Sequence, residues 1–440
     1  MARKRFWLTA VLAFSAFTPE TVRAEENSFA SLEALDGRLP PWLHFSGEYR
    51  SRWEAKAGQN FSTRDDGYLL SRLWFTTEIK PTEWLSFVGQ MQDSRVFFNS
   101  VIPSRPPYQN TFDIHQAYVQ IGHRETGWAD LRVGRQELRF GGQRLVGASH
   151  WSNASRVFDA VRLGLHTDGI RVDLFSSSVV QSRDGVVDHH SQGDDLHGAY
   201  GSLYRLLPHA VLEPYFFWRL EDARLTPGEI SRSGHLDEKT FGFRLVGGLP
   251  RNWNYEMEMA KQFGSLGPAS IHSWAGYWTV GRRFKDLPAQ PRPFAAYNYA
   301  SGDKNPHDRT EGAFDQLYPS GHDKLGLADQ IGWRNIHNLQ FGMDLRPGTK
   351  WTLKLAYQHD WLASSRDGLY STSGTYVVKP VAGPVSTNVG QEMDLQAKYT
   401  WRSSVELGVG YAHFFTGEFL NQTTTGKDFN YPYGVLNYTF

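Results

Sequence analysis

Residues 431–440 read YPYGVLNYTF, and the period-two alternation in this stretch predicts a β-strand. The residues that share one face of that strand are Pro432, Gly434, Leu436, Tyr438 and Phe440. A last strand that ends on an aromatic residue is typical of β-barrels in the Gram-negative outer membrane, where the last strand pairs with the first and leaves no open edge. We therefore expect barrel-assembly machinery to bind this strand through Phe440.

The other end of the sequence has the pattern of an export signal. A basic start (residues 3–5) precedes a short apolar stretch (6–17), and Ala24 ends a typical cleavage pattern. The alternative is a short buried helix. No later stretch reaches the roughly 18 consecutive apolar residues that a membrane-spanning helix needs, so a membrane role requires a barrel. We predict a signal peptide over residues 1–24, a periplasmic lead-in over 25–42 and an outer-membrane barrel over 43–440.

The composition is consistent with a barrel wall, which is apolar on alternate residues only and carries aromatic girdles. Of the 440 residues, 40% are hydrophobic and 14% are aromatic. The sequence has no cysteine, which excludes disulfide scaffolds, thiolate metal sites and a cysteine nucleophile. The 46 basic and 46 acidic residues balance, so nothing indicates nucleic-acid binding.

Alternating segments continue along the whole sequence. In the first of them Tyr49 alternates with Arg50 and Arg52, which is a period of two and not the 3.6 of a helix. We read about 18 such segments. They start near residues 43, 67, 84, 113, 130, 156, 169, 195, 210, 239, 252, 270, 293, 334, 350, 390, 403 and 431.

The connections between these segments alternate in length. The short ones are near residues 81–82, 122–129, 166–167, 207–208, 250–251, 285–292, 347–348 and 401–402. The others are long, over 55–66, 96–112, 140–155, 178–194, 222–238, 301–333, 361–389 and 417–430, with a short exception at 264–269. A soluble β-sandwich has no reason to alternate in this way. We predict an all-β, transmembrane, antiparallel up-and-down barrel with short periplasmic turns and long extracellular loops.

If the apolar face of each segment contacts lipid, the other face lines the lumen. The basic residues on that face are Arg50, Arg52, Arg72, Arg132, Arg162, Arg171, Arg334, Lys354 and Lys398. The acidic ones are Glu48, Glu54, Asp173, Glu256, Glu258, Asp344, Glu392, Asp394 and Glu406. These charges either pair across strands and stiffen the wall, or attract an anionic solute while the acids keep its binding weak.

Several motifs resemble the alginate-export family of outer-membrane barrels. They are GRQELRFGGQRLVG (134–147), WSNASRVFDAVRL (151–163), the stretch YASGDKNPHDRTEGAFDQLYPSGHDKLGLADQIGWRN (299–335), QDSR (92–95) and VGQEMDLQAKYTW (389–401). The resemblance covers nearly the whole mature chain. It implies an 18-stranded barrel and a passive conduit, which in the best-known members passes an anionic polysaccharide along an arginine-rich pore.

The resemblance also implies positions for individual residues. Arg135, Arg144 and Arg156 would lie near the outer mouth, Arg95 with Asp93 at the top of the third strand, and Arg334 where the longest loop returns to the wall. That loop, 301–333, would fold inward as a plug ordered by Tyr318, Pro319 and His322, with Asp303 at its start. Together with the lumen-facing residues, the expected conduit is Arg50, Arg52, Arg72, Arg95, Arg135, Arg144, Arg156, Arg334, Lys354, Glu392 and Asp394.

Other site chemistry is weakly indicated. Asp303, Asn305 and Asp308 are close enough in sequence to suit calcium, but the glycine and glutamate of an EF-hand loop are missing. No nucleophile-elbow, P-loop or metalloprotease motif occurs, and adjacent Ser149 and His150 point apart, so we expect no enzyme and no cofactor. We expect a monomer, because no broad flat interface can be read.

Three functions remain open. The first is a conduit for an anionic polysaccharide or related anionic solute, and the second is a selective uptake porin for small organic solutes. The third is a barrel enzyme or adhesion scaffold with a closed lumen. The predicted lumen is balanced in charge, whereas a dedicated polyuronate exporter should be strongly electropositive inside, so the substrate does not follow from the family resemblance.

Overall fold

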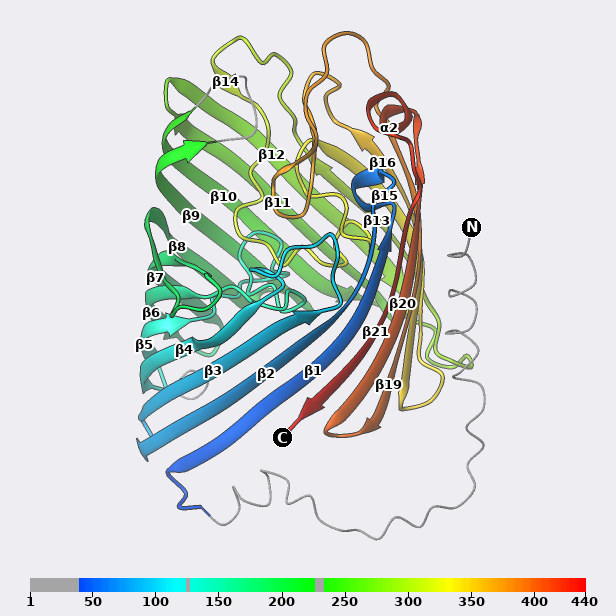
Figure 1. The fold of residues 1–440 in the computed structure, drawn as a ribbon. Coiled ribbons are helices and arrows are strands. Elements are labelled where there is room, and N and C mark those ends of the chain that lie inside the picture. The colour runs from blue at the N-terminus through cyan, green and yellow to red at the C-terminus, as the bar shows by residue number, and fades with distance from the viewer. Residues whose placement is uncertain (1–38, 124–126, 226–232) are drawn as a thin grey trace, which may run out of the picture.

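The computed structural model describes residues 39–123, 127–225 and 233–440. The predicted signal peptide and most of the predicted lead-in lie outside these residues. One sheet curls into a closed barrel of 18 antiparallel strands, as the sequence predicts (Figure 1). In the described part of the chain no helix is long and apolar enough to cross a membrane.

The wall strands follow one another around the barrel in chain order. They are β1 (Leu43–Ala57), β2 (Asp65–Thr82), β3 (Leu85–Phe97), β4 (Asn110–Gly122), β5 (Ala129–Gln136), β6 (Phe158–His166), β7 (Ile170–Gln181), β8 (His189–Leu207), β9 (Ala210–Leu225), β10 (Ser233–Leu249), β11 (Trp253–Leu266), β12 (Ala269–Arg282), β13 (Arg292–Ala300), β15 (Ile336–Leu345), β16 (Trp351–Leu362), β19 (Asn388–Arg402), β20 (Val405–Thr416) and β21 (Phe429–Thr439). Most begin close to the predicted starts. The largest differences are at β8 and β10, which begin earlier than predicted. Residues that precede the apolar pattern of these two strands already pair with the neighbouring strands.

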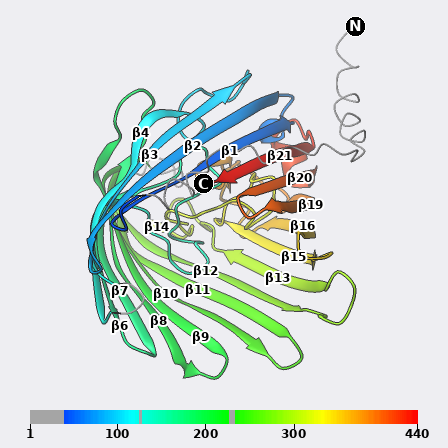
Figure 2. The same cartoon turned by 90° about the horizontal axis from the view of Figure 1, so that it is seen from below.

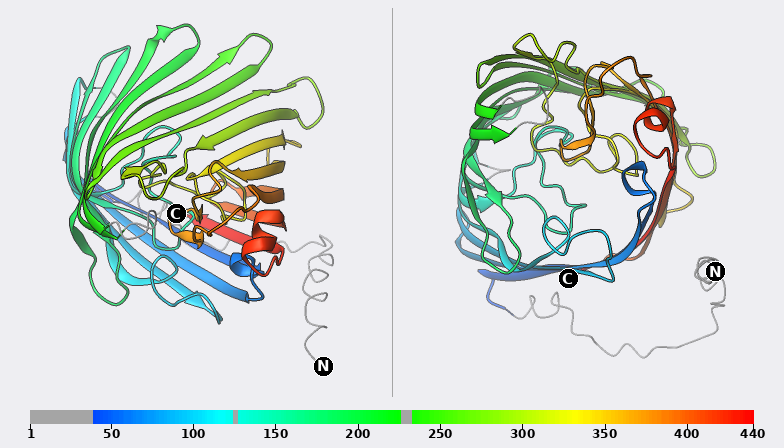
Figure 3. Two further views of the ribbon diagram at one scale, coloured as in Figure 1. Left: turned by 90° about the horizontal axis from the view of Figure 1, so that it is seen from above. Right: turned by 45° about the horizontal axis from the view of Figure 1, so that its top comes forward.

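Strand connections sort by length as predicted, with the expected short exception at 267–268 between β11 and β12. The short turns, such as 83–84 between β2 and β3, lie at one end of the barrel, which we call the turn end. The long connections lie at the opposite end, which we call the loop end, and several of them fold into the barrel interior (Figures 2 and 3). Short elements within these connections are η1 (Gln59–Phe61), β14 (Thr310–Glu311), β17 (Leu369–Tyr370), β18 (Tyr376–Val378) and α2 (Glu418–Thr423).

Side chains alternate between the outside and the inside of the wall. On β20 the outward Val409 is 58% exposed, whereas on β1 the inward Arg52 is 2% exposed. All the charged residues of the wall strands that were predicted to face the lumen lie on the inward face of their strands. Many pair across strands, for example Arg162 with Asp173 at 2.8 Å and Arg292 with Asp344 at 2.8 Å. Charged pairs on this face stiffen the wall without exposing charge to lipid.

Three connections form a folded plug inside the barrel. We call them the first inner loop (137–157), the second inner loop (301–335) and the third inner loop (363–387). They share one apolar core with the wall. Its members include Phe140, Leu145, Val146, Phe314, Tyr318, Leu325, Leu327, Ile331, Trp333, Leu369 and Val378 from the loops, and Phe175, Tyr200, Tyr215 and Phe217 from β7, β8 and β9. The interior on this side is a packed core and not an open channel.

The barrel closes where β1 pairs with β21, from Glu48 opposite Thr439 to Ala57 opposite Asn430. At the turn end of this seam, the Phe440 N–H donates to Gly47 O at 3.0 Å and the Gly47 N–H donates to Phe440 O at 2.7 Å. The Phe440 ring lies over Gly47, where an added Cβ would come within 2.4 Å of the ring carbons. The last residue therefore packs on a glycine of the first strand and secures the seam.

We predict that Gly47→Val will destabilise the barrel by about 1–3 kcal/mol, because the new side chain meets both the Phe440 ring and the Trp74 carbonyl oxygen. The temperature at which the folded band is lost on a heat-modifiability gel measures this effect. Gly89→Val on β3 is a matched control, since Gly89 also lies in a strand and nothing lies within 4 Å of its added Cβ. Equal melting of the two variants would contradict the role of Phe440 at the seam.

Candidate functional site

Arginines on β1 and β2 hold the first inner loop against the wall. The Arg50 guanidinium donates to His150 O at 2.6 Å and to Ser152 O at 3.0 Å. Arg72 donates to the same two carbonyls at 2.9 and 3.1 Å. Charge-assisted hydrogen bonds of this kind are the strong ones, so these side chains fix the position of the loop.

Arg52 adds a third contact to the first inner loop. Its guanidinium donates to Trp151 O at 2.6 Å and pairs with Glu54 at 2.6 Å. The central carbon of the same guanidinium lies 3.8 Å from the centre of the Trp151 ring. All three arginines that the sequence placed in the conduit on β1 and β2 are thus engaged by the loop.

Asn153 completes this attachment. Its side-chain amide donates to Ser71 O, Arg95 O and Tyr108 O at 2.9 to 3.1 Å, and its oxygen accepts from Arg50 at 3.3 Å. The residue is 1% exposed. One buried amide therefore joins the loop to three backbone segments, which an apolar residue of the same size could not do.

The first and second inner loops are joined by backbone hydrogen bonds. Val146 and Tyr318 form a parallel bridge, flanked by bonds from Gly147 N–H to Tyr318 O at 2.9 Å and from Tyr318 N–H to Leu145 O at 2.8 Å. The Arg156 guanidinium donates to Pro319 O at 3.0 Å. These contacts attach the first inner loop to the second.

The second inner loop is bonded to the wall at β16 and β19. The Ala328 N–H donates to the Glu392 carboxylate at 2.8 Å, and the Leu327 N–H to Asp394 at 3.3 Å. Lys354 on β16 pairs with Asp323 at 2.7 Å. Burial raises the pKa of Asp323, but Lys354, together with His322 and Lys324, holds that pKa below its ordinary value. Three residues predicted to line the conduit thus bind the plug.

Trp151 and His322 stack where the two loops meet. Their ring centres are 3.8 Å apart and the rings are parallel. Because Arg52 lies equally close to the Trp151 ring, the indole must be sandwiched between the guanidinium and the imidazole. The His322 Nδ1 atom lies 2.6 Å from Asp329 Oδ2, which orients the imidazole. This sandwich links the wall, the first inner loop and the second inner loop.

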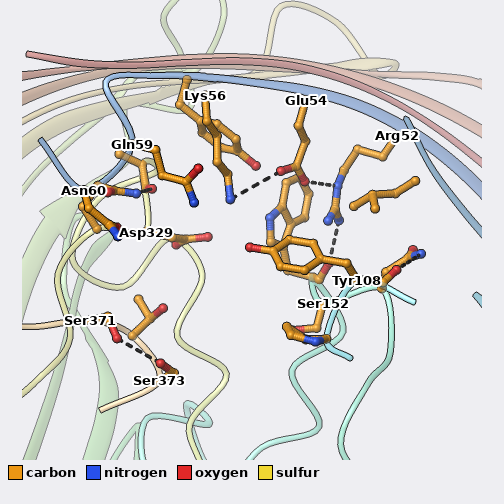
Figure 4. Close-up of a pocket in the computed structure, with 18 of the residues that line it drawn as sticks. Arg52, Glu54, Lys56, Gln59, Asn60, Tyr108, Ser152, Asp329, Ser371 and Ser373 are labelled. Atoms are coloured by element: carbon orange, nitrogen blue, oxygen red, sulfur yellow. Dashed lines mark hydrogen bonds and ion pairs between the residues drawn. The ribbon is translucent and has the colours of Figure 1, made fainter. Parts of the chain in front are cut away.

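Two chambers lie on either side of the sandwich, and Trp151 lines both. The loop-end chamber has a volume of about 350 Å³ and contains Lys56, Tyr108, Asp329, Ser371 and Ser373 in its lining (Figure 4). The turn-end chamber has a volume of about 550 Å³, and its lining includes Arg50, Arg72, His322, Asp323, Lys398 and Glu406. The Trp151–His322 stack therefore lies where the two chambers meet.

Two of the arginines predicted at the outer mouth lie on the outer face of the wall. Arg95 shares the outward parity of Phe87 and Phe97, is about half exposed, and pairs with Asp93 at 2.7 Å. Arg135 has the outward parity of Val133 and pairs with Asp159 at 2.9 Å. Both lie near the loop end of their strands but on the outer face, because strand parity and not position along the strand decides the side.

Arg144 and Arg334 lie inside the plug. Arg144 packs on the Tyr277 ring at 3.4 Å, and it lies close to Lys324. Burial, followed by the charge of Arg144, lowers the pKa of Lys324 to about 8. Arg334 donates to Glu311 at 3.1 Å and lies 4.5 Å from the Tyr370 ring centre.

The calcium candidate receives no geometric support. Asp303 accepts the Asn305 N–H at 2.9 Å, and Asp308 accepts the Thr310 N–H at 2.8 Å, so both carboxylates order the loop backbone. In the described ranges no group of three or more His, Asp or Glu residues is arranged to hold a metal ion. Asp303 lies instead beside Asp367 and Glu311, with Arg334 among them.

Sequence reasoning missed the residues that form the constriction. Trp151 and Asn153 lie in the quoted WSNASRVFDAVRL motif, but the motif alone gave them no role. Lys56 and Asp329 were missed because they line the same chamber from positions that are far apart in sequence. The signal that could have found them was the polar run following Trp151 in a long loop, since binding residues are often carried on loops.

The barrel wall and the folded plug define an outer-membrane channel of the porin type. The chain belongs to a particular family within that class: the family described as "Alginate export" matches residues 41–432. This confirms the resemblance seen in the sequence. A search of curated proteins found no match.

Solved structures share the fold at low sequence identity. OccAB2 of Acinetobacter baumannii is 11% identical with a TM-score of 0.61, over 90% of this chain and 98% of that one. OccK3 (OpdO) of Pseudomonas aeruginosa is 14% identical with a TM-score of 0.60, over 93% and 99%. OpdQ of the same organism is 14% identical with a TM-score of 0.58, over 91% and 99%.

We predict that Arg50→Met will loosen the first inner loop and raise single-channel conductance and current noise, because two loop carbonyls lose a charged donor. Each such bond contributes about 1.5–3 kcal/mol. Arg132→Met is the matched control. Arg132 also faces the lumen, but its contacts are to Gln120 and the Tyr118 ring on the wall. Indistinguishable currents from the two variants would show that Arg50 does not anchor the loop.

The carboxylates around Arg334 predict a pH dependence of stability. Burial raises the pKa of Glu311 to about 7; Arg334 opposes this shift, and Asp367 and Asp303 add to it. Since this pKa is higher in the folded state, the stabilisation is complete below the ordinary value of 4.5 and is lost as the pH rises through about 7. We expect the melting temperature of the protein to fall between pH 5 and pH 8, and that of Glu311→Gln to fall less. An equal fall of the melting temperature with pH in the two proteins would contradict this assignment.

Proposed function

We propose that the protein is a selective passive channel for small polar organic solutes, and that a polysaccharide cannot pass while the plug is in place. The observation that carries this proposal is the packed core shared by the three inner loops and the wall. Beside it, the described lumen along β1 and β21 holds the two chambers of about 350 and 550 Å³. Cavities of this size suit single small molecules.

Displacing the plug is costly. A polymer wide enough to fill the lumen would have to break the arginine contacts to His150 O, Trp151 O and Ser152 O together with the Val146–Tyr318 bridge. At about 1.5–3 kcal/mol for each hydrogen bond to a charged group, the contacts to the first inner loop alone oppose this by several kcal/mol. Small solutes need only a local rearrangement at the Trp151–His322 stack.

Export of an anionic polysaccharide is the second candidate, and the family match favours it. It requires an open state in which the first inner loop leaves the wall. Arg50, Arg52 and Arg72 would then lose their loop partners and present three guanidinium groups to the lumen. The same side chains that hold the plug in the closed state would become the anion-binding wall of the open one.

A disulfide between the two loops distinguishes these candidates. Ser149 N lies 2.8 Å from Ser320 Oγ, and the chain has no cysteine that could mispair, so Ser149→Cys with Ser320→Cys should tie the first inner loop to the second, which Glu392 and Lys354 hold on the wall. We expect the oxidised variant in liposomes to remain permeable to glycerol and lactate. We also expect polyuronate to block neither the reduced nor the oxidised channel in planar bilayers.

The single variants Ser149→Cys and Ser320→Cys are the controls, since neither can form the intramolecular bond. Block by polyuronate in the reduced double variant that disappears on oxidation would favour the polysaccharide conduit instead. The absence of any solute flux in all forms would contradict a channel function.

A further inference from the structure

The loop-end chamber has opposite charges on opposite sides. Arg52, Glu54 and Lys56 lie along β1, while Asp329, Ser371 and Ser373 lie across the chamber on the inner loops (Figure 4). Glu54 is buried and is engaged by Arg52 at 2.6 Å and by the Tyr68 hydroxyl, also at 2.6 Å. The wall side therefore carries two cations for one anion, and its excess charge is positive.

Lys56 is the cation that is most open to a solute on this side. Its ammonium lies 5.6 to 5.7 Å from the ring centres of Tyr68, Tyr108 and Tyr431, and 3.9 Å from Glu54. Three aromatic rings orient an ammonium without cancelling its charge, because they offer only a quadrupole. At 3.9 Å the Glu54 contact is at the long end of an ion pair, so the charge of Lys56 still acts on the chamber.

Asp329 supplies the opposite charge. Its carboxylate accepts from His322 Nδ1 at 2.6 Å and from the Asp323 N–H at 3.3 Å, and it lines the chamber beside the hydroxyl groups of Ser371 and Ser373. No lysine or arginine of the described chain lies within ion-pair distance of it. The plug side of the chamber is therefore negative and rich in hydrogen-bonding groups.

We propose that the loop-end chamber is a binding site for small zwitterions, with the acid group of the solute toward Lys56 and its ammonium group toward Asp329. This inference rests on the proposed channel function and names its substrate class. An anion would be repelled by Asp329 and a cation by Lys56, whereas a zwitterion satisfies both sides at once. The chamber volume of about 350 Å³ fits a molecule of amino-acid size.

Liposome swelling with three solutes of similar size tests the proposal: serine as a zwitterion, lactate as an anion and glycerol as a neutral reference. For the unaltered protein we expect the serine-to-glycerol ratio of swelling rates to exceed the lactate-to-glycerol ratio. Lys56→Met and Asp329→Asn each remove one charge, and we expect either change to lower the serine-to-glycerol ratio by roughly twofold to fivefold. Asparagine keeps an oxygen acceptor for His322, so the stack should persist.

The two variants should act in opposite directions on lactate. Lys56→Met should lower the lactate-to-glycerol ratio, and Asp329→Asn should raise it. Lys56→Gln repeats the first test if the methionine variant does not fold. Matched controls are Lys261→Met, on the outward face of β11, and Asp308→Asn, in the exposed start of the second inner loop.

Glycerol flux separates failure of this inference from failure of the channel function. If glycerol passes but the serine and lactate ratios are the same in all variants, the zwitterion site is refuted and the channel remains. If lactate shifts in the same direction in both charge variants, the site is likewise refuted. If glycerol does not pass through the unaltered protein, both proposals are refuted together.

Discussion

Closure of the wall is the constraint on which the rest of the structure depends. In lipid every backbone donor and acceptor must find a partner within the protein, and a sheet can achieve this only if its first and last strands pair. Here β1 and β21 do so, with Phe440 bonded to Gly47 and packed over it. A closed wall of 18 strands encloses a lumen too wide for wall side chains alone to fill, so loops enter it.

The loops in the lumen are held by charges that cannot face lipid. Strand alternation directs arginines inward, and a guanidinium in the lumen gains most from carbonyl and carboxylate partners. Arg50, Arg52 and Arg72 obtain them from residues 150–152 of the first inner loop. The arginines that the sequence predicted as the lining of a conduit therefore attach the plug to the wall in this structure.

The Trp151–His322 stack connects the wall with the inner loops. It depends on Arg52 from the wall, Trp151 from one loop and His322 from another, and it separates the two chambers. Small displacements of either loop would change the path for solutes without unfolding the plug. The charge arrangement around it, with Lys56 on the wall and Asp329 on the plug, then decides which solutes are favoured.

The sequence by itself determined the barrel, its strand number, the side of each wall charge and the alternation of turns and loops, because these depend on a local period of two and on loop length. It also determined the family through contiguous motifs. Only the tertiary structure decided which partners the charges take. Arg50 contacts His150 and Trp151 contacts His322, although 100 residues or more separate each pair in sequence. Such contacts depend on where the folded loops dock and not on any local sequence pattern.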